Sequence, residues 1–250
     1  MAHQLSKSQV DQLGERIKGG EISEADLGLL DAYRHSFAQA YEYVVGRIRD
    51  DLNLEPTGRP TKSTTSITYK LARESIRLSQ MQDIAGCRII VPDIIIQDVV
   101  VGRLTEIFGT RSVFDRREAP NSGYRAVHVV VRYLERPIEV QVRTALQHVW
   151  AELSEKLSDV VSPAVKYGDG PTDLMDVLLQ ASNIGAKVER HEKQVFALEQ
   201  RERLREATSF EQDNIGLEIS NLEASVFEAK RGLAEMLKRM IGEAHIWRDD

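Results

Sequence analysis

Two short segments near the middle of the chain constrain the fold most strongly, because both alternate between apolar and polar side chains. Along Ala126–Tyr133 every second residue is a valine or a tyrosine, and along Pro137–Thr144 the apolar residues alternate with Glu139, Gln141 and Arg143. A period of two is typical of a strand with two different faces, and the short connection between the segments predicts a hairpin. The polar face either meets solvent or carries chemistry, and the pattern alone leaves both open.

A further strand is predicted at the end of Met81–Val91. Here Asp83 is followed by Ala-Gly, then by Arg88, and then by the β-branched run Ile-Ile-Val. A carboxylate at the start of a strand can hold a metal ion, and a nearby guanidinium can bind phosphate or stack on a base. Asp83 and Glu139 together favour a pair of carboxylates that holds Mg²⁺ against a nucleotide, and the alternative is a turn with two surface charges.

Helical patterns surround the predicted strands. Ser23 with Asp26 forms a capping-box-like start, followed by one apolar helical stripe. The residues of that stripe are Leu27, Leu30, Phe37, Tyr41, Val44, Ile48 and Leu52. Further helices are predicted at residues 5–18, 97–108, 145–157, 173–206 and 211–246. The Pro-Gly-rich break at residues 162–173 predicts a catalytic unit over 1–172 and a helical hairpin over 173–250.

The segment Arg59–Arg88 is locally basic. It holds six basic and two acidic residues, which give +4 in a chain whose net charge is −6. From Lys62 the helical period places Ser66, Lys70, Arg73 and Arg77 on nearly one face. Such a face suits a triphosphate, although charged helix faces are more often simply solvated. The segment lacks the glycine spacing of a Walker loop, so we expect side chains to hold any phosphate.

Composition narrows the class of protein. A net charge of −6 argues against a protein that coats nucleic acid by charge alone. The lone cysteine, Cys87, precedes Ile-Ile-Val, which predicts a buried, unreactive thiol in a reducing compartment. The first residues show no apolar signal core, and no window approaches the roughly 18 apolar residues of a membrane span. We therefore expect a cytoplasmic protein.

Four motifs in order resemble the synthetase domain of the RelA/SpoT family, and in size the chain is similar to the small alarmone synthetases. The motifs are Arg59 with Lys62, Ser66 and Lys70; Asp83–Arg88; Ser122–His128; and Glu139–Thr144. Each is weak alone, but together and at this spacing they are specific. The resemblance covers about residues 25–170.

The resemblance implies an α+β fold with a nucleotidyltransferase-like mixed sheet flanked by helices and a C-terminal helical extension. It implies Mg²⁺-dependent transfer of pyrophosphate from ATP to the 3′-hydroxyl of GDP or GTP, releasing AMP. By resemblance, ATP is bound by Arg59, Lys62, Ser66, Lys70 and Arg88. Asp83 and Glu139 are the catalytic and metal-binding residues. The acceptor is bound by Ser122, Tyr124, Arg125, His128, Gln141 and Arg143. A homo-oligomer and an antitoxin are the further partners that the family suggests.

Two departures from the family pattern are visible, the first on the ATP side and the second on the acceptor side, and the second keeps other acceptors open. Arg59 and Lys62 are separated by two residues rather than one, and Ser122-Gly123 stands where synthetases commonly carry Asn-Gly. A serine hydroxyl cannot reproduce the paired donor and acceptor of a carboxamide, so adenine acceptors are alternatives. A toxin that modifies the 3′ end of tRNA is a second alternative, for which Arg201, Arg203 and Arg205, or Lys230, Arg231, Lys238 and Arg239, would supply a basic patch. A non-catalytic nucleotide sensor is the third.

Overall fold

The computed structural model describes residues 5–20, 22–206 and 215–244, without the side chains of Arg59, Arg205, Glu206 and Ile215. The helices are α1 (Lys7–Gly19), α2 (Glu24–His35), α3 (Ala38–Leu52), α4 (Thr64–Arg73), α5 (Ile94–Phe108), α6 (Ala145–Val160), α7 (Thr172–Glu206) and α8 (Ile215–Gly242). Two short 3₁₀ turns are η1 (Leu78–Gln80) and η2 (Val165–Tyr167). The strands are β1 (Thr57–Arg59), β2 (Ala85–Val91), β3 (Val113–Asp115), β4 (Val127–Tyr133) and β5 (Arg136–Thr144).

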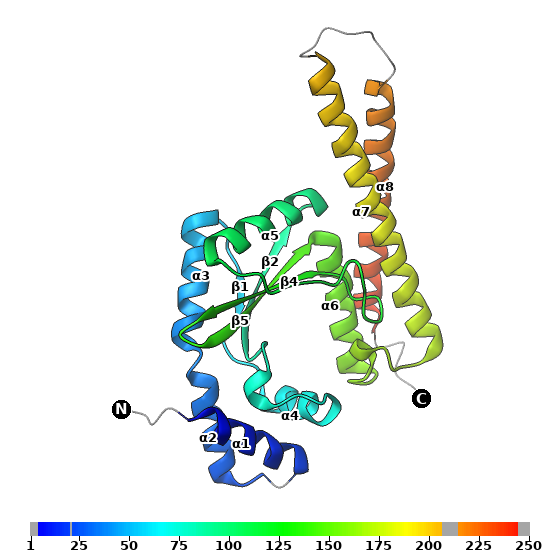
Figure 1. The fold of residues 1–250 in the computed structure, drawn as a ribbon. Helices are drawn as coiled ribbons and strands as arrows, with labels where there is room; N and C mark the ends of the chain where they lie inside the picture. The colour runs from blue at the N-terminus through cyan, green and yellow to red at the C-terminus, as the bar shows by residue number, and fades with distance from the viewer. Residues whose placement is uncertain (1–4, 21, 207–214, 245–250) are drawn as a thin grey trace. The chain divides into compact units, whose positions relative to one another are not determined.

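The five strands form one mixed sheet in the order β1-β2-β5-β4-β3, which confirms the predicted α+β class (Figure 1). β1 pairs antiparallel with β2, with Thr57 opposite Arg88 and Arg59 opposite Gly86. The predicted hairpin is β4–β5. Its two turn residues, Leu134 and Glu135, have φ values of 47° and 59°, the left-handed pair that a type I′ hairpin turn requires.

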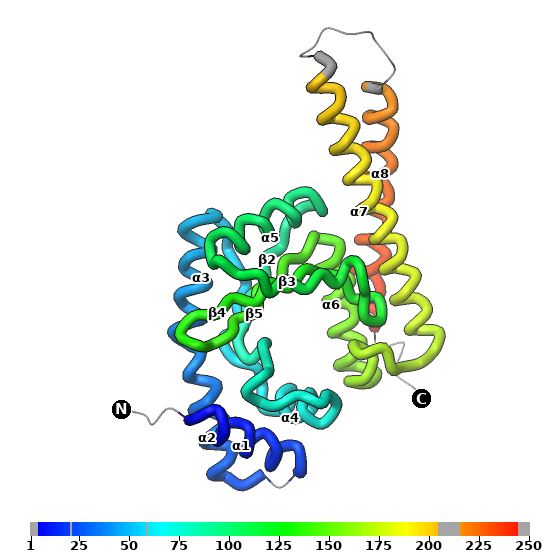
Figure 2. Tube along the Cα trace, in the orientation of Figure 1, coloured from blue at the N-terminus to red at the C-terminus, as the bar shows by residue number. Residues whose placement is uncertain are grey.

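The chain divides into two compact units, which we describe one at a time. The first unit contains residues 1–89, 102–113 and 128–141, and the second contains residues 90–101, 114–127 and 142–250. Figure 2 follows the chain through both units by residue number.

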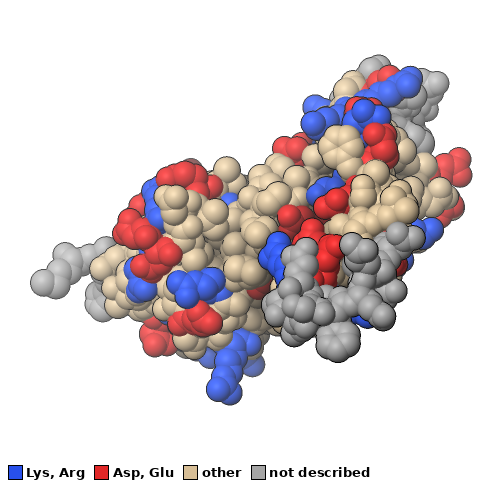
Figure 3. Space-filling model, turned by 90° about the horizontal axis from the view of Figure 1, so that it is seen from above, with Lys and Arg blue, Asp and Glu red and all other residues tan. Residues whose placement is uncertain are grey.

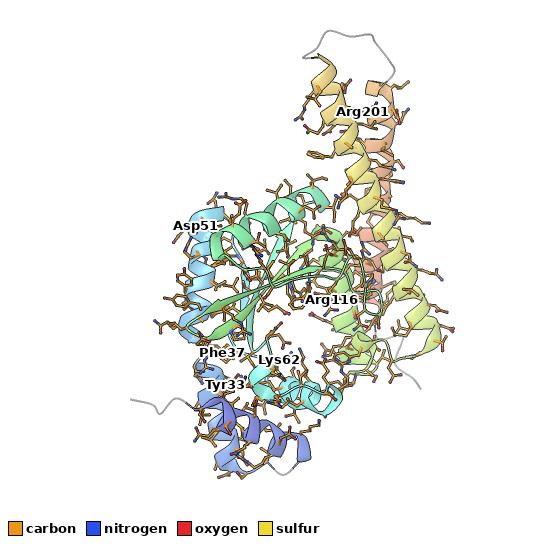
Figure 4. All side chains as sticks on the ribbon, in the orientation of Figure 1. Tyr33, Phe37, Asp51, Lys62, Arg116 and Arg201 are labelled. Atoms are coloured by element: carbon orange, nitrogen blue, oxygen red, sulfur yellow. The ribbon has the colours of Figure 1, made fainter. Side chains whose placement is uncertain are left out.

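In the first unit, the predicted single apolar helix is two helices, α2 and α3, so that prediction was wrong. The helix ends at Ser36, whose hydroxyl donates to the Tyr33 carbonyl at 2.6 Å and offers that carbonyl a partner outside the helical ladder. The turn buries Phe37 completely against Tyr33, with the ring centroids 5.2 Å apart (Figure 4). Within α2, Leu27 of the predicted stripe is 44% exposed, whereas Leu30 is buried as expected.

The start of α2 follows the predicted capping box. The Ser23 hydroxyl accepts from the Asp26 N–H at 3.1 Å, and the Asp26 carboxylate accepts from the Ser23 N–H at 3.2 Å. Arg16 of α1 pairs with the same carboxylate at 2.8 Å. These hydrogen bonds to Arg16 and Ser23 lower the pKa of Asp26 to about 2. The pairing ties α1 to the first turn of α2.

The basic helix is shorter than predicted. α4 ends at Arg73, because Glu74 adopts an extended backbone with φ −106° and ψ 142°. The chain then turns to bury Leu78 against Gly14 of α1, where a methyl group on the glycine would lie 2.7 Å from the Leu78 Cβ. Arg77, expected on the helix face with Lys70, therefore lies beyond the helix and is exposed.

In the second unit, α6, α7 and α8 pack around one apolar cluster. Trp150 of α6 is buried in it, and its indole N–H donates to the Leu178 carbonyl of α7 at 2.8 Å. α7 and α8 run side by side, as the predicted hairpin requires. On α8, Met236 is 40% exposed, whereas its neighbour Leu237 is fully buried. A domain boundary at residue 172 stays a prediction.

No helix within the described ranges is both long and apolar enough to cross a bilayer. On the face shown in Figure 3, basic and acidic side chains are interspersed, and neither sign forms a broad patch of its own. Such a surface gives little electrostatic attraction for an extended polyanion.

We expect the Cys87 thiol to be unreactive in the folded protein. Cys87 lies on β2 and is buried; burial, reinforced by the negative charge of Glu139, raises its pKa to about 12. A thiol-specific reagent such as Ellman's reagent should therefore label almost nothing at pH 8 before denaturation, and one thiol per chain in guanidinium chloride. Because the unfolded thiol ionises near pH 8.5 and the folded thiol does not, stability should also fall as the pH rises above about 9. Fast, stoichiometric labelling of the native protein would contradict the buried placement.

Candidate functional site

Two lysines converge on one carboxylate in the first unit. Lys62 Nζ lies 2.9 Å from Asp83 Oδ2, and Lys70 Nζ lies 2.9 Å from Asp83 Oδ1. Lys62 stands in the segment that leads into α4 (Figure 4), and its N–H donates to the Ile84 carbonyl at 2.7 Å. That hydrogen bond fixes the start of α4 beside the start of β2. Lys62, Lys70 and Asp83, which we call the lysine–aspartate triad, are thus brought together; the sequence singled out each of the three residues but did not predict the ion pairs between them.

The triad keeps Asp83 ionised. Burial acts to raise the pKa of its carboxyl group, but the charges of Lys70 and Lys62 and their hydrogen bonds outweigh burial, so the pKa is lowered from the ordinary value. Each carboxylate oxygen holds its own ammonium group. Asp83 is therefore a fixed negative charge at neutral pH.

Ser66, predicted as a phosphate ligand, sits in the first turn of α4. Ser63 caps this helix: its hydroxyl oxygen accepts from the Ser66 N–H at 3.2 Å and its O–H donates to Ser66 Oγ at 2.8 Å. Sequence reasoning did not single out Ser63, although a serine directly before a helical segment is a recognisable N-cap signal. The N-terminus of α4 therefore presents hydroxyl and backbone N–H groups, which suit an anion.

Glu139 on β5, also in the first unit, is the second of the two carboxylates predicted to hold Mg²⁺. His128 Nδ1 lies 3.0 Å from its Oε1, and Gln141 Nε2 donates to its Oε2 at 2.8 Å. Burial acts to raise the pKa of Glu139, but the hydrogen bond and charge of His128 and the hydrogen bond of Gln141 outweigh it, so the pKa is lowered. The negative charge of Asp83 acts on Glu139 in the raising direction, so the two carboxylates are close enough to interact.

Gly86 brings β2 and β5 together at Glu139. A Cβ at position 86 would lie 2.6 Å from the Glu139 carbonyl oxygen, well inside any normal contact. Any larger residue at position 86 would therefore displace β5 at the residue that carries the second carboxylate.

The two arginines expected on the adenine are on neighbouring strands. Residue 59 ends β1 opposite Gly86, and residue 88 of β2 lies opposite Thr57, so positions 59 and 88 are diagonal neighbours in the β1–β2 ladder. Arg88 is half-buried, and the side chain of Arg59 lies outside the described part of the chain. The role of each in ATP binding stays a prediction.

A second cluster lies in the second unit. Arg143 Nη2 donates to the Tyr124 hydroxyl at 3.1 Å, and the Arg143 guanidinium carbon lies 5.2 Å from the centre of the Tyr124 ring. The Trp150 ring is tilted against Tyr124 with the centroids 6.4 Å apart. Arg143 is buried, whereas Tyr124 is half-buried. A ring held by a cation and an indole is already ordered for stacking on a base.

Arg125 and Ser122 were both predicted as acceptor ligands, and each has protein partners. Arg125 Nη1 donates to the Arg117 carbonyl at 2.8 Å, and Nη2 forms an ion pair with Glu189 of α7. Ser122 has a φ of 52°, and its hydroxyl lies next to Asn121. Sequence reasoning missed Glu189; its one signal was an acidic residue directly after Val188 on the apolar stripe of α7.

Comparison with known proteins finds a family match over the segment that contains these residues. Residues 58–158 match the family model described as the region found in RelA and SpoT proteins. We call this matched part of the chain the RelA/SpoT domain. The matched range contains the triad, Glu139 and Tyr124, and it ends within α6.

Curated relatives of the RelA/SpoT domain are the uncharacterized protein Rv1366 of Mycobacterium tuberculosis and the uncharacterized protein Mb1401 of Mycobacterium bovis. Each is 31% identical over 140 residues, which are 55% of this chain and 51% of the relative. The chain thus spans about half the length of the curated relatives it matches.

Solved structures similar to the chain include the small alarmone synthetase 1 from Bacillus subtilis, with 24% identity and a TM-score of 0.49 over 67% of this chain and 97% of that one. The same enzyme bound to its product pppGpp gives 24% identity and a TM-score of 0.49 over 65% and 96%.

Proposed function

We propose that the RelA/SpoT domain transfers pyrophosphate from ATP to the 3′-hydroxyl of a guanine nucleotide, GDP or GTP, and releases AMP. The observation that carries the proposal is the lysine–aspartate triad, in which two ammonium groups meet at one carboxylate within 2.9 Å. Two converging ammonium groups beside the start of a helix form a site for adjacent phosphates. The RelA/SpoT match over the same residues supports this use of the triad.

The donor set of the first unit fits Mg²⁺. Magnesium is usually held by one or two carboxylates together with substrate phosphates, rather than by a full cage of protein ligands. Asp83 and Glu139 are such a pair, and the described residues contain no cluster of three or more His, Cys, Asp or Glu side chains suited to a metal. Bound there, Mg²⁺ would neutralise charge on the transferring phosphates.

In the proposed reaction, Lys62, Lys70 and Ser66 hold the phosphates of ATP, and Tyr124 stacks on the acceptor base. Glu139, ionised at neutral pH, accepts the proton of the acceptor 3′-hydroxyl. The 3′-oxygen forms a bond to the β-phosphorus. The bond from that phosphorus to the oxygen that bridges it to the α-phosphorus breaks, and AMP leaves with the electron pair. His128 and Gln141 hold the Glu139 carboxylate in place. Catalysis of this kind consists mostly of positioning and charge stabilisation.

Modification of tRNA is the second candidate, and three of the four residues in the expected α8 patch pair with acidic side chains. Lys230 pairs with Glu192 at 2.6 Å, Arg231 with Glu228 at 2.7 Å and Arg239 with Glu243 at 3.1 Å. Ion pairs of this kind leave little net charge for phosphate contacts. A small nucleotide is therefore favoured as the acceptor.

The deciding experiment offers ATP labelled at the β-phosphate to the purified protein with GDP, GTP, ADP, AMP and deacylated tRNA in parallel. We expect label on GDP or GTP, dependent on Mg²⁺. Label on ADP or AMP alone would move the proposal to adenine acceptors, and label on tRNA alone would replace it with the toxin reaction. Binding of ATP without any transfer would leave the nucleotide sensor.

Replacing Tyr124 with alanine should weaken acceptor use far more than ATP use. If stacking is the lost interaction, the acceptor KM should rise by a factor that corresponds to about 1–3 kcal/mol, roughly 5- to 150-fold. Tyr124→Phe is the matched control, because it keeps the ring and removes only the hydroxyl that accepts from Arg143. Steady-state kinetics with each substrate varied in turn measures both variants. An acceptor KM that stays at the wild-type value in Tyr124→Ala would place the base elsewhere.

A further inference from the structure

The loop that carries Tyr124 is clamped by helices of the second unit. At Gly123, whose φ is +86°, an added Cβ would lie 2.9 Å from Trp150 of α6 and 3.2 Å from the Ser182 Cβ of α7. Leu178, also of α7, presents its carbonyl oxygen at 3.5 Å from the same point. Only a residue without a side chain allows the loop to approach the two helices this closely. The backbone just before Tyr124 therefore rests directly on α6 and α7.

Polar side chains complete the clamp on the other side of Tyr124. Glu189 of α7 is buried, and both of its carboxylate oxygens are used: Oε2 accepts from Arg125 Nη2, and Oε1 accepts from Gln147 Nε2 at 2.7 Å. Gln147 in turn accepts at Oε1 from Gln97 Nε2 at 2.8 Å. Gln97 accepts at Oε1 from Arg117 Nη1 at 3.1 Å. A buried carboxylate with one cationic partner strongly favours the loop position in which that partner is in reach.

Glu189 lies outside the RelA/SpoT match, which ends at residue 158. The contact therefore joins the Tyr124 loop to a helix that the family match does not include. Glu192, three residues along α7, forms a similar ion pair with Lys230 of α8 and accepts from the Ile94 N–H at 3.2 Å, and among the described residues it has no hydrogen bond to the loop. The two glutamates have nearly equal side-chain exposure, 8% and 9%. They differ mainly in their ion-pair partners, which are Arg125 of the Tyr124 loop for Glu189 and Lys230 of α8 for Glu192.

We propose that Glu189 is a positioning residue for the acceptor, holding Arg125 and with it the Tyr124 ring in the orientation that stacks on the base. The proposal rests on the function proposed above. Glu189 touches no substrate; it acts through Arg125, next to Tyr124 in the chain. Without the charge of Glu189, Arg125 is no longer held against α7. The loop then samples positions in which Tyr124 no longer faces the acceptor. The helix α7 is in this sense part of the acceptor subsite.

The test compares Glu189→Gln with Glu192→Gln. In Glu189→Gln we expect the acceptor KM to rise roughly tenfold or more, the ATP KM to stay within about twofold, and Glu189→Asp, which keeps the charge, to recover part of the loss. Glu192→Gln should change neither KM by more than about twofold, because its pair holds α8 rather than the loop. Equal effects of the two glutamine variants, or a rise in both KM values in Glu189→Gln, would reduce Glu189 to a structural role and overturn the proposal.

A second measurement does not depend on enzyme activity. Hydrogen exchange of the loop amides, among them the Tyr124 N–H that donates to the Asn121 carbonyl at 2.9 Å, should accelerate in Glu189→Gln and not in Glu192→Gln. Unchanged loop exchange in a folded Glu189→Gln overturns the proposal even if activity falls. Faster loop exchange in a chain that transfers no pyrophosphate supports the clamp and overturns only the proposed function.

Discussion

Asp83→Asn is expected to reduce pyrophosphate transfer by about 1,000-fold or more while leaving the protein folded. Asparagine has nearly the same shape but lacks the charge that holds Lys62, Lys70 and, in the proposed site, Mg²⁺. The loss of metal-assisted charge stabilisation alone accounts for several kcal/mol of the barrier. Single-turnover kinetics with saturating ATP and GDP measures the effect on the transfer step.

The variant also makes an opposite prediction for binding. With Asp83 neutral, the two lysines have no counterion in the triad, so ATP without Mg²⁺ should bind as tightly as to the wild type or more tightly. Calorimetric titration with EDTA present checks this. Asp51→Asn is the matched control: Asp51 pairs with Arg47 on α3 of the same unit (Figure 4), and its loss should leave transfer unchanged. Transfer by Asp83→Asn at a rate near that of the wild type would remove Asp83 from the site.

Glu139→Gln is expected to lower the transfer rate by about 10²–10⁴, the usual range for loss of a positioned general base. Glutamine can still accept from Gln141 or His128 through its amide oxygen, so the strand should keep its place. We expect kcat to fall with little change in the ATP KM. The measurement is the initial rate of AMP release with both substrates varied.

Glu135→Gln provides the control, because Glu135 lies at the exposed tip of the same hairpin and should tolerate the identical change. A fall of less than about tenfold in Glu139→Gln would show that another group accepts the proton. Equal losses in the two variants would point to damage of the hairpin.

The sequence predicted those parts of the fold that depend on local pattern. The β4–β5 hairpin follows from strict alternation, and the start of α2 follows from Ser23 and Asp26, each a matter of a few neighbouring residues. The break between α2 and α3 was missed, because Phe37 fits the helical stripe equally well and only tertiary packing buries it at a turn. The end of α4 was missed for the same reason: Leu78 is buried against α1, far away in sequence.

The candidate site shows the same division. The three residues of the triad could be singled out from the sequence, because Lys62 and Lys70 lie on a basic segment and Asp83 comes just before a strand, but the ion pairs between them were not predicted. The ion pair that Arg125 forms could not be predicted from the sequence. The position of Arg125 suggested a substrate ligand, but its guanidinium pairs with Glu189, which lies 64 residues further along the chain. No local pattern connects two side chains at that separation, and only the packing of α7 reveals the contact.

The lysine–aspartate triad also bears on which anions can compete at this site. A bare sulfate or orthophosphate that takes the two ammonium groups strands the Asp83 carboxylate without a counterion, and that cost weakens its binding. A nucleoside triphosphate that arrives with its own divalent cation provides the displaced carboxylate with a new partner. We therefore expect the resting site to bind inorganic anions weakly and to prefer the cation-bound nucleotide even in a phosphate-rich solution.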